Sequence, residues 1–137
     1  MRHRATQIAL VAIALGLNAE PSVAERNLVP SLERTYTVCP DRPAEPGWMQ
    51  NIALRDAYQR VLVQDIYRAQ NLERIVETGT CSCEVRFPAW DRAEIIFREN
   101  HATAIRWEML NASDTYNRRA TNLRRDAKAI CEAVGNW

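Results

Sequence analysis

The sequence is poor in the residues that enzymes commonly use for catalysis. It contains two histidines in 137 residues, and only His101 lies beyond the first few positions. No carboxylate lies three or four residues from His101, and the chain has no paired-histidine zinc motif and no serine in a known nucleophile motif. We therefore expect no catalytic residue, no metal site and no cofactor, and we predict that the protein is not an enzyme.

Long hydrophobic runs are also absent, apart from one near the start of the chain. Residues 8–17 carry no charge, follow two arginines, and are too few to form a stable membrane anchor. Small residues then occur at Ser22-Val23-Ala24, as a signal peptidase requires. We predict a signal peptide at 1–24 and a single exported domain at 25–137, located in the periplasm or secreted, with no stable membrane anchor after cleavage.

A net charge of one sign is missing as well. The whole chain has a formal charge of +1, and cleavage removes Arg2, Arg4 and Glu20, which leaves a neutral protein. Proteins that bind nucleic acid without a specific motif need an excess of basic residues to displace counterions from phosphates. We therefore predict that nucleic acid is not a partner.

Glycine and proline are scarce where helices are expected. Neither occurs in 48–78, where apolar residues recur every three or four positions, and this pattern predicts one long helix ended by Gly79. Residues 79–87 form a connector. Neither residue type occurs in 89–134, and the apolar seam there keeps a steady phase, which predicts a second helix over 88–134. The seam consists of Ala102, Ile105, Met109, Ala112, Tyr116, Ala120, Leu123, Ala127, Ile130 and Val134.

These segments predict an all-α fold, a long antiparallel helical hairpin preceded by an extended lead-in at 25–47. Pro40, Pro43 and Pro46 recur every third residue there, which is typical of a stiff strut on the protein's own helices or of a ligand for a partner's aromatic groove. The polar cluster at 111–117 offers an alternative, because a helix break there gives a three-helix bundle.

The four cysteines all lie in the exported part, which predicts two disulfides in an oxidising compartment. In the hairpin, Cys131 lies at the far end of the second helix, and the extended lead-in brings Cys39 to it. Cys81 and Cys83 are then left to pair with each other or with another molecule. In the three-helix bundle, Cys131 returns to the connector and pairs with Cys81 or Cys83 instead.

The seam beyond Ala120 has no cover in the hairpin, which predicts a homodimer or another protein partner on this stripe. A basic run overlaps it and either faces solvent or meets anionic lipid or an acidic partner protein. Trp137 stands out as well, since a chain end frays unless its aromatic ring docks on something. The candidate partner-binding residues are Leu123, Ile130, Val134, Arg118, Arg119, Arg124, Arg125 and Trp137.

Several short segments occur together in the exported part: Cys39-Pro40, Pro46-Gly47-Trp48, the run 69–79, Cys81-Ser82-Cys83, and 130–137 with Gly135-Asn136-Trp137. With them, the chain resembles a family of small exported proteins associated with bacterial conjugal-transfer and type IV secretion gene sets. The resemblance implies an accessory or structural part at the cell envelope, similar in character to helical minor pilus components, and it implies no catalytic residue.

Three hypotheses for function follow. The first is an exported envelope protein that acts by protein contact, within a conjugation or secretion apparatus. The second is a small thiol–disulfide or metal-handling protein that uses Cys81 and Cys83. The third is an inhibitor or immunity-type binder of an envelope enzyme.

Overall fold

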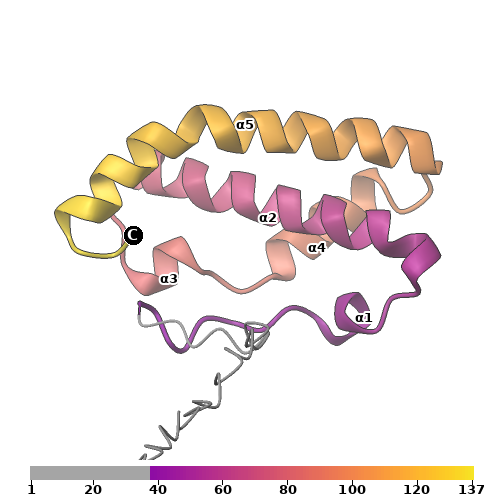
Figure 1. Cartoon of the computed structure of the whole chain (residues 1–137), viewed down its shortest axis with the longest axis horizontal. Coiled ribbons are helices and arrows are strands. Elements are labelled where there is room, and N and C mark those ends of the chain that lie inside the picture. The colour runs from indigo at the N-terminus through magenta and orange to yellow at the C-terminus, as the bar shows by residue number, and fades with distance from the viewer. Residues whose placement is uncertain (1–37) are drawn as a thin grey trace, which may run out of the picture. The chain divides into compact units, whose positions relative to one another are not determined.

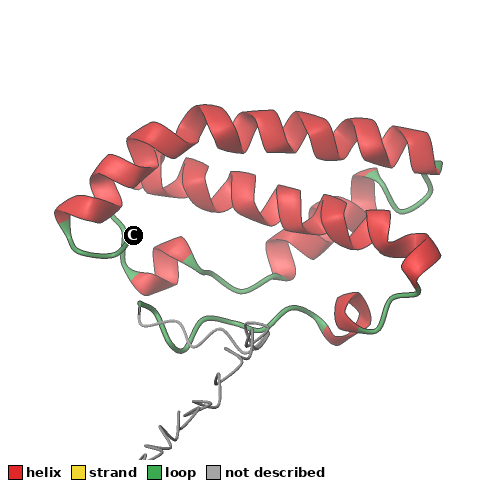
Figure 2. Ribbon diagram, viewed as in Figure 1, coloured by secondary structure: helices red, strands yellow, loops and turns green. Residues whose placement is uncertain are grey.

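The computed structural model describes residues 38–137, so the predicted signal peptide at 1–24 and the first part of the lead-in lie outside the described residues. Within the described range all regular structure is helical, which confirms the all-α prediction (Figure 2). The elements are α1 Gly47–Gln50, the 3₁₀ turn η1 Leu54–Asp56, α2 Ala57–Thr78, α3 Cys83–Arg86, α4 Asp91–Asn100 and α5 Arg106–Ala133.

The first predicted helix, 48–78, is divided into α1, η1 and α2. The side chain of Asn51 ends α1 by donating to the carbonyl of Gly47 at 2.8 Å, and Ala53 is extended before the next turn begins. The far end agrees with the sequence. Gly79 takes the left-handed conformation at φ 63°, and its N–H donates to the carbonyl of Ile75 at 2.9 Å, as expected for a glycine C-cap.

The second predicted helix, 88–134, is not continuous. It is replaced by α4 and α5, and the chain reverses in the turn at 101–105. Ile105 is extended there, and the carboxylate of Glu108 accepts a hydrogen bond from its N–H at 3.0 Å, which caps the start of α5. The polar cluster at 111–117, where the sequence offered a break, lies inside α5.

Because of this turn, α2 and α5 run in the same direction (Figure 1). α4 lies between them in the sequence and runs back in the opposite direction. Ser113 donates a hydrogen bond to buried Asp65, and Arg119 pairs with Glu73 further along both helices. The antiparallel hairpin is therefore wrong, and the three-helix alternative describes the arrangement of the long helices, with its turn at 101–105.

The core has one cluster toward each end of the α2/α5 pair. The cluster near the 101–105 turn joins α1, α2, α4 and the start of α5, and its buried members are Met49, Leu62, Val63, Ile66, Ala93, Phe97 and Met109. The cluster near the connector joins the end of α2 to the end of α5, and its members are Ala69, Leu72, Ile75, Cys81, Ala120, Ala127 and Cys131. The second half of α5 is thus covered by α2.

The described part of the lead-in, residues 38–46, packs on the helices of the same chain. The indole N–H of Trp90 donates to the carbonyl of Pro43 at 3.3 Å, and the Trp90 ring stacks on Tyr67 with centroids 3.8 Å apart. Glu45 forms an ion pair with Arg60 at 2.7 Å. These contacts are those of the internal strut, the first of the two interpretations of the proline spacing.

Candidate functional site

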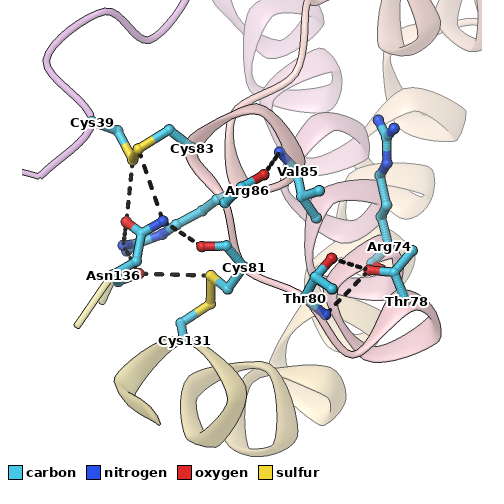
Figure 3. Close-up of a disulfide and its surroundings, with 11 residues drawn as sticks. Cys39, Arg74, Thr78, Thr80, Cys81, Cys83, Val85, Arg86, Cys131 and Asn136 are labelled. Carbon is cyan, nitrogen blue, oxygen red and sulfur yellow. Dashed lines mark hydrogen bonds between the residues drawn. A yellow bond between two sulfur atoms is a disulfide. The ribbon is translucent and has the colours of Figure 1, made fainter. Parts of the chain in front are cut away.

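The four cysteines meet at the connector end of the molecule, where they form two disulfides (Figure 3). Cys39 pairs with Cys83, with Cα atoms 5.4 Å apart, and Cys81 pairs with Cys131 at 5.1 Å. The pairing predicted from the hairpin is wrong: Cys39 does not pair with Cys131, and Cys81 and Cys83 pair neither with each other nor with another molecule. The physical reason is the turn at 101–105, which brings the end of α5 back to the connector, as the three-helix alternative required.

The disulfides leave no thiol in the oxidised protein, since none of the four cysteines is free. Cys39, Cys81 and Cys131 are at most 4% exposed, whereas Cys83 is exposed. A soft metal needs thiolate ligands, and a strained ring between Cys81 and Cys83 does not form. In this arrangement Cys81 and Cys83 therefore form neither a disulfide with each other nor a pair of free thiolates for a metal ion.

Asn136 lies between the two disulfides and links them (Figure 3). Its side-chain amide donates to the carbonyl of Cys81 at 2.5 Å, and its Oδ1 lies 3.1 Å from the sulfur of Cys39. The guanidinium of Arg86 donates to the Asn136 carbonyl. The side chain is 8% exposed, so these contacts satisfy a buried amide.

The end of α5 sets the position of Asn136. Gly135 has φ 70° and donates its N–H to the carbonyl of Glu132 at 3.1 Å, while the N–H of Asn136 reaches back to the carbonyl of Cys131 at 2.8 Å. This is the hydrogen-bond pattern of a Schellman C-cap. Because glycine adopts the positive φ without steric cost, the chain turns sharply there and places Asn136 and Trp137 against the connector.

Trp137, one of the candidate partner-binding residues, docks on its own chain. It is half-buried and packs against the cluster that contains Ile75 and Ala127. Two guanidinium groups lie over its ring, that of Arg86 at 4.9 Å and that of Arg124 at 5.1 Å from the centroid. Both distances are within the range of a cation–π contact.

The basic run of α5 is largely neutralised. Arg118 pairs with Asp114, Arg119 with Glu73, Arg125 with Asp126 at 3.1 Å and Lys128 with Glu132 at 3.4 Å. Among the basic residues of this run, only Arg124 has no carboxylate partner in residues 38–137. The candidate partner-binding arginines Arg118, Arg119 and Arg125 therefore differ from Arg124, whose guanidinium faces an aromatic ring.

The apolar seam beyond Ala120 is internal. Ala120 and Ala127 are 2% and 0% exposed, and Leu123 and Ile130 are half-buried against the same cluster on α2. Val134, at 65% exposed, follows the last residue of α5. The prediction that the seam beyond Ala120 is uncovered is wrong. It placed the helix predicted at 48–78 beside the first half of the second helix, whereas α2 packs against the end of α5.

A cavity of about 340 Å³ opens beside Trp137, between α2, α3 and the chain segment after α5. Burial lowers the pKa of Arg86 on its rim, and the positive charges of Arg42 and Arg124 lower it further. Burial also raises the pKa of Tyr67, against a hydrogen bond with Asn71. Sequence reasoning missed the contact of Arg86 with Asn136, because only the reversal at 101–105 brings the end of α5 to the connector. It also missed Tyr67, whose contacts with Pro88 and Trp90 join α2 to the segment before α4.

The opposite end of the molecule exposes apolar side chains. Leu54, Ile105, Trp107 and Leu110 are between 40% and 92% exposed, and Arg106 lies 5.3 Å over the ring of Tyr58, which places the start of α5 beside the start of α2. Three of the four lie in or next to the first turns of α5, and Leu54 is the first residue of η1, the turn that precedes α2.

His101 belongs to the turn between α4 and α5. Its ring meets that of Tyr116 edge-on, with centroids 6.1 Å apart, and its buried Nε2 has no hydrogen-bond partner. Burial lowers the pKa of His101, so the neutral form is favoured at neutral pH. Across residues 38–137, no cluster of three or more histidine, cysteine, aspartate or glutamate side chains has a metal-binding arrangement.

None of the helices in the described range has the length and apolar character needed to cross a membrane. Comparisons with known proteins add no relative: no family model, no curated protein and no solved structure matches this chain.

Proposed function

We propose that this protein is an exported accessory component of the bacterial cell envelope that acts by binding other proteins, within a conjugal-transfer or type IV secretion apparatus. Its exported form begins at Glu25, it resides in the periplasm or is secreted, and its function is binding and not catalysis. The resemblance of the segments around Cys39, 69–79 and 130–137 is the basis for naming the apparatus.

The observation that carries export is the pair of disulfides. Both join segments distant in sequence, with separations of 44 and 50 residues, and three of the four cysteines are buried. Such bonds form and persist in oxidising compartments, whereas cytosolic thiols are kept reduced. The charged and apolar segments before Ala24 supply the matching signal peptide.

The observation that favours protein contact is the apolar end formed by Leu54, Ile105, Trp107 and Leu110. Trp107 is 66% exposed and Leu54 is 92% exposed, so both lose much apolar surface to water when a partner covers them. Tryptophan is enriched among the residues that contribute most to protein interfaces. We therefore propose that a hydrophobic surface of another envelope protein binds at this end.

Site-specific photo-crosslinking in the native host tests this proposal. A photoreactive phenylalanine analogue replaces Trp107 in one strain and Arg125, an exposed residue far along α5, in the matched control. We expect a discrete adduct with an envelope protein from position 107 and none from position 125, both in the periplasmic or membrane fraction. Equal adducts from both positions, or a full-length chain that stays in the cytoplasm, would contradict the proposal.

The start of the exported form is a separate measurement. Intact mass of the protein from the periplasm or medium is expected to correspond to a chain that begins at Glu25. An exported chain that retains residues before Ser22 would show that the proposed cleavage site is wrong.

A further inference from the structure

We propose that the cavity beside Trp137 is a carboxylate-binding pocket that takes an acidic side chain, flanked by apolar residues, from a partner protein. This inference rests on the proposed function, because it names a second contact through which the exported protein binds its partner. The cavity lies at the connector end, away from the apolar end at Trp107.

The shape of the pocket suits a side chain. Its floor is formed by Leu72 and Ile75, which are 9% and 0% exposed, and aromatic rings including that of Trp137 stand beside it. The volume of about 340 Å³ is at the lower end of the range of roughly 300–1,000 Å³ for ligand sites. Such a space holds one large side chain or two small ones, with apolar contact below and around it.

The charge at the rim is positive and uncompensated. Arg86 and Arg124 both line the cavity, and neither pairs with a carboxylate anywhere in residues 38–137. Each guanidinium carbon lies about 5 Å from the centre of the Trp137 ring, so the two are within about 10 Å of each other. A third cation on the rim, Arg68, already pairs with Asp65 at 2.8 Å.

Like charges held this close repel each other, and the lowered pKa of Arg86 reflects both its burial and that repulsion. A cation–π contact with Trp137 stabilises each guanidinium but leaves its positive charge in place. A carboxylate between Arg86 and Arg124 neutralises their excess positive charge. It also accepts hydrogen bonds from the planar guanidinium groups, the geometry in which arginine binds carboxylates best.

The same features favour an acidic peptide over a phosphate group or a nucleic acid. Two guanidinium groups without a carboxylate partner in residues 38–137 match one carboxylate, and the other basic residues of the run on α5 are already paired with carboxylates. The exported chain is neutral overall, so it lacks the broad positive field that binds polyanions. The apolar floor at Leu72 and Ile75 requires a ligand whose charged group is attached to apolar atoms.

Peptide titration followed by nuclear magnetic resonance tests the pocket in the oxidised, exported protein. The probe is the acetylated, amidated peptide Leu-Glu-Leu, and its matched control is Leu-Gln-Leu, which has the same shape without the charge. We expect the glutamate peptide to shift the indole N–H signal of Trp137, assigned with W137F, and to bind at least 5-fold more tightly than the glutamine peptide. Inorganic phosphate at the same concentrations is expected to bind more weakly than the glutamate peptide.

Two variants separate the pocket from general surface charge. Arg124 is exposed, so R124Q is expected to keep the fold and to weaken binding of the glutamate peptide at least 5-fold. R125Q removes the neighbouring exposed charge and is expected to leave binding unchanged. The inference is overturned if both peptides bind equally, if R124Q binds like the native protein, or if phosphate binds more tightly than the glutamate peptide.

The crosslinking strain with the photoreactive residue at position 107 connects the pocket to the proposed function. We expect R124Q to lower the yield of the partner adduct and R125Q to leave it unchanged. An adduct that forms equally well with R124Q would overturn the pocket as a docking site while the proposed function stands. The absence of any adduct in the native background would instead contradict the proposed function itself.

Discussion

Removing the disulfide between Cys81 and Cys131 is expected to cost about 4 kcal/mol of the free energy of unfolding. The bond closes a loop over a sequence separation of 50 residues. In the chain-entropy estimate, a cross-link over that length lowers the entropy of the unfolded chain by an amount equivalent to about 4 kcal/mol at 25 °C. The double variant C81A/C131A removes the bond without leaving a single reactive thiol.

The expected loss is a large part of the total, because domains of this size are stable by about 5–15 kcal/mol. For a domain of roughly 100 residues, each kcal/mol shifts the melting temperature by about 4–8 °C, so C81A/C131A is expected to melt about 15–30 °C lower than the native protein. Circular dichroism at 222 nm during heating and urea denaturation measures both quantities on the oxidised protein.

The matched control is C39A/C83A, whose bond closes a loop of similar length, a separation of 44 residues, and is expected to cost a similar amount. The two variants differ in where they loosen the native state. Loss of the Cys81–Cys131 bond frees the end of α5, so hydrogen exchange is expected to increase at Ala127–Ala133 in C81A/C131A and not in C39A/C83A.

Tryptic mapping without reduction checks the pairing on which this estimate depends. Both Cys81 and Cys83 lie on the peptide 75–86, so the native protein is expected to yield one product that joins 35–55, 75–86 and 129–137. C81A/C131A is expected to yield only 35–55 joined to 75–86. A direct link between 35–55 and 129–137, or a loss of stability below about 1 kcal/mol, would refute the reasoning.

Three further predictions concern the turn and the interface of α2 with α5. S113A removes the hydrogen bond to buried Asp65 and is expected to lower the free energy of unfolding by about 1–3 kcal/mol, measured by urea denaturation; no loss would mean that Asp65 does not need this donor. Burial lowers the pKa of His101 in the folded state, so on acidification the unfolded chain binds a proton at this residue before the folded chain does. The stability contributed by neutral His101 is therefore present above pH 6.5 and falls below that pH. H101Q is expected to show a smaller drop in melting temperature from pH 7 to pH 5 than the native protein, and identical drops would contradict this. A127L overpacks a site that is 0% exposed and is expected to cost about 1–3 kcal/mol, whereas A129L, on the exposed face, should be within about 0.5 kcal/mol of the native protein by thermal melting.

The sequence was sufficient for the features that depend on neighbours along the chain. Gly79 ends α2 because a left-handed cap needs glycine, and the apolar period up to that point predicted the helix. Trp137 docks because Gly135 turns the chain back. The lead-in lies against the helices of its own chain, as one interpretation of the proline spacing expected, but its contact with Trp90 through the Pro43 carbonyl was not predicted.

Contacts between different helices could not be predicted from neighbouring residues along the chain. Asp65 has Arg68 three residues later, a spacing typical of an ion pair on a solvated helix face, yet it is buried against Ser113 of α5. Arg86 lies in the connector predicted at 79–87, and its contact with Asn136 exists only because α5 ends at the connector. No periodicity within one helix carries this information, since it is set by the direction in which the next helix returns.

The continuity of the seam explains why the break at 101–105 escaped detection. The predicted seam begins at Ala102, inside the turn, so Ala102 and Ile105 are its only members before α5. Both are exposed in the structure, so neither shows that the helix continues from α4 into α5. The buried residues of α4 are Ala93 and Phe97, which on a continuous helix would point about 120–160° away from Met109, at 100° per residue. The buried face therefore changes phase between α4 and α5, as it must when a chain reverses and packs its next helix against the same core from another side. Because the turn contains neither proline nor glycine, and its cap is a glutamate three residues after an isoleucine, this change of phase was the main local sign of the reversal. The angles of the apolar positions on the two sides of this turn therefore favour the three-helix alternative, in which Cys131 returns to the connector that holds Cys81 and Cys83.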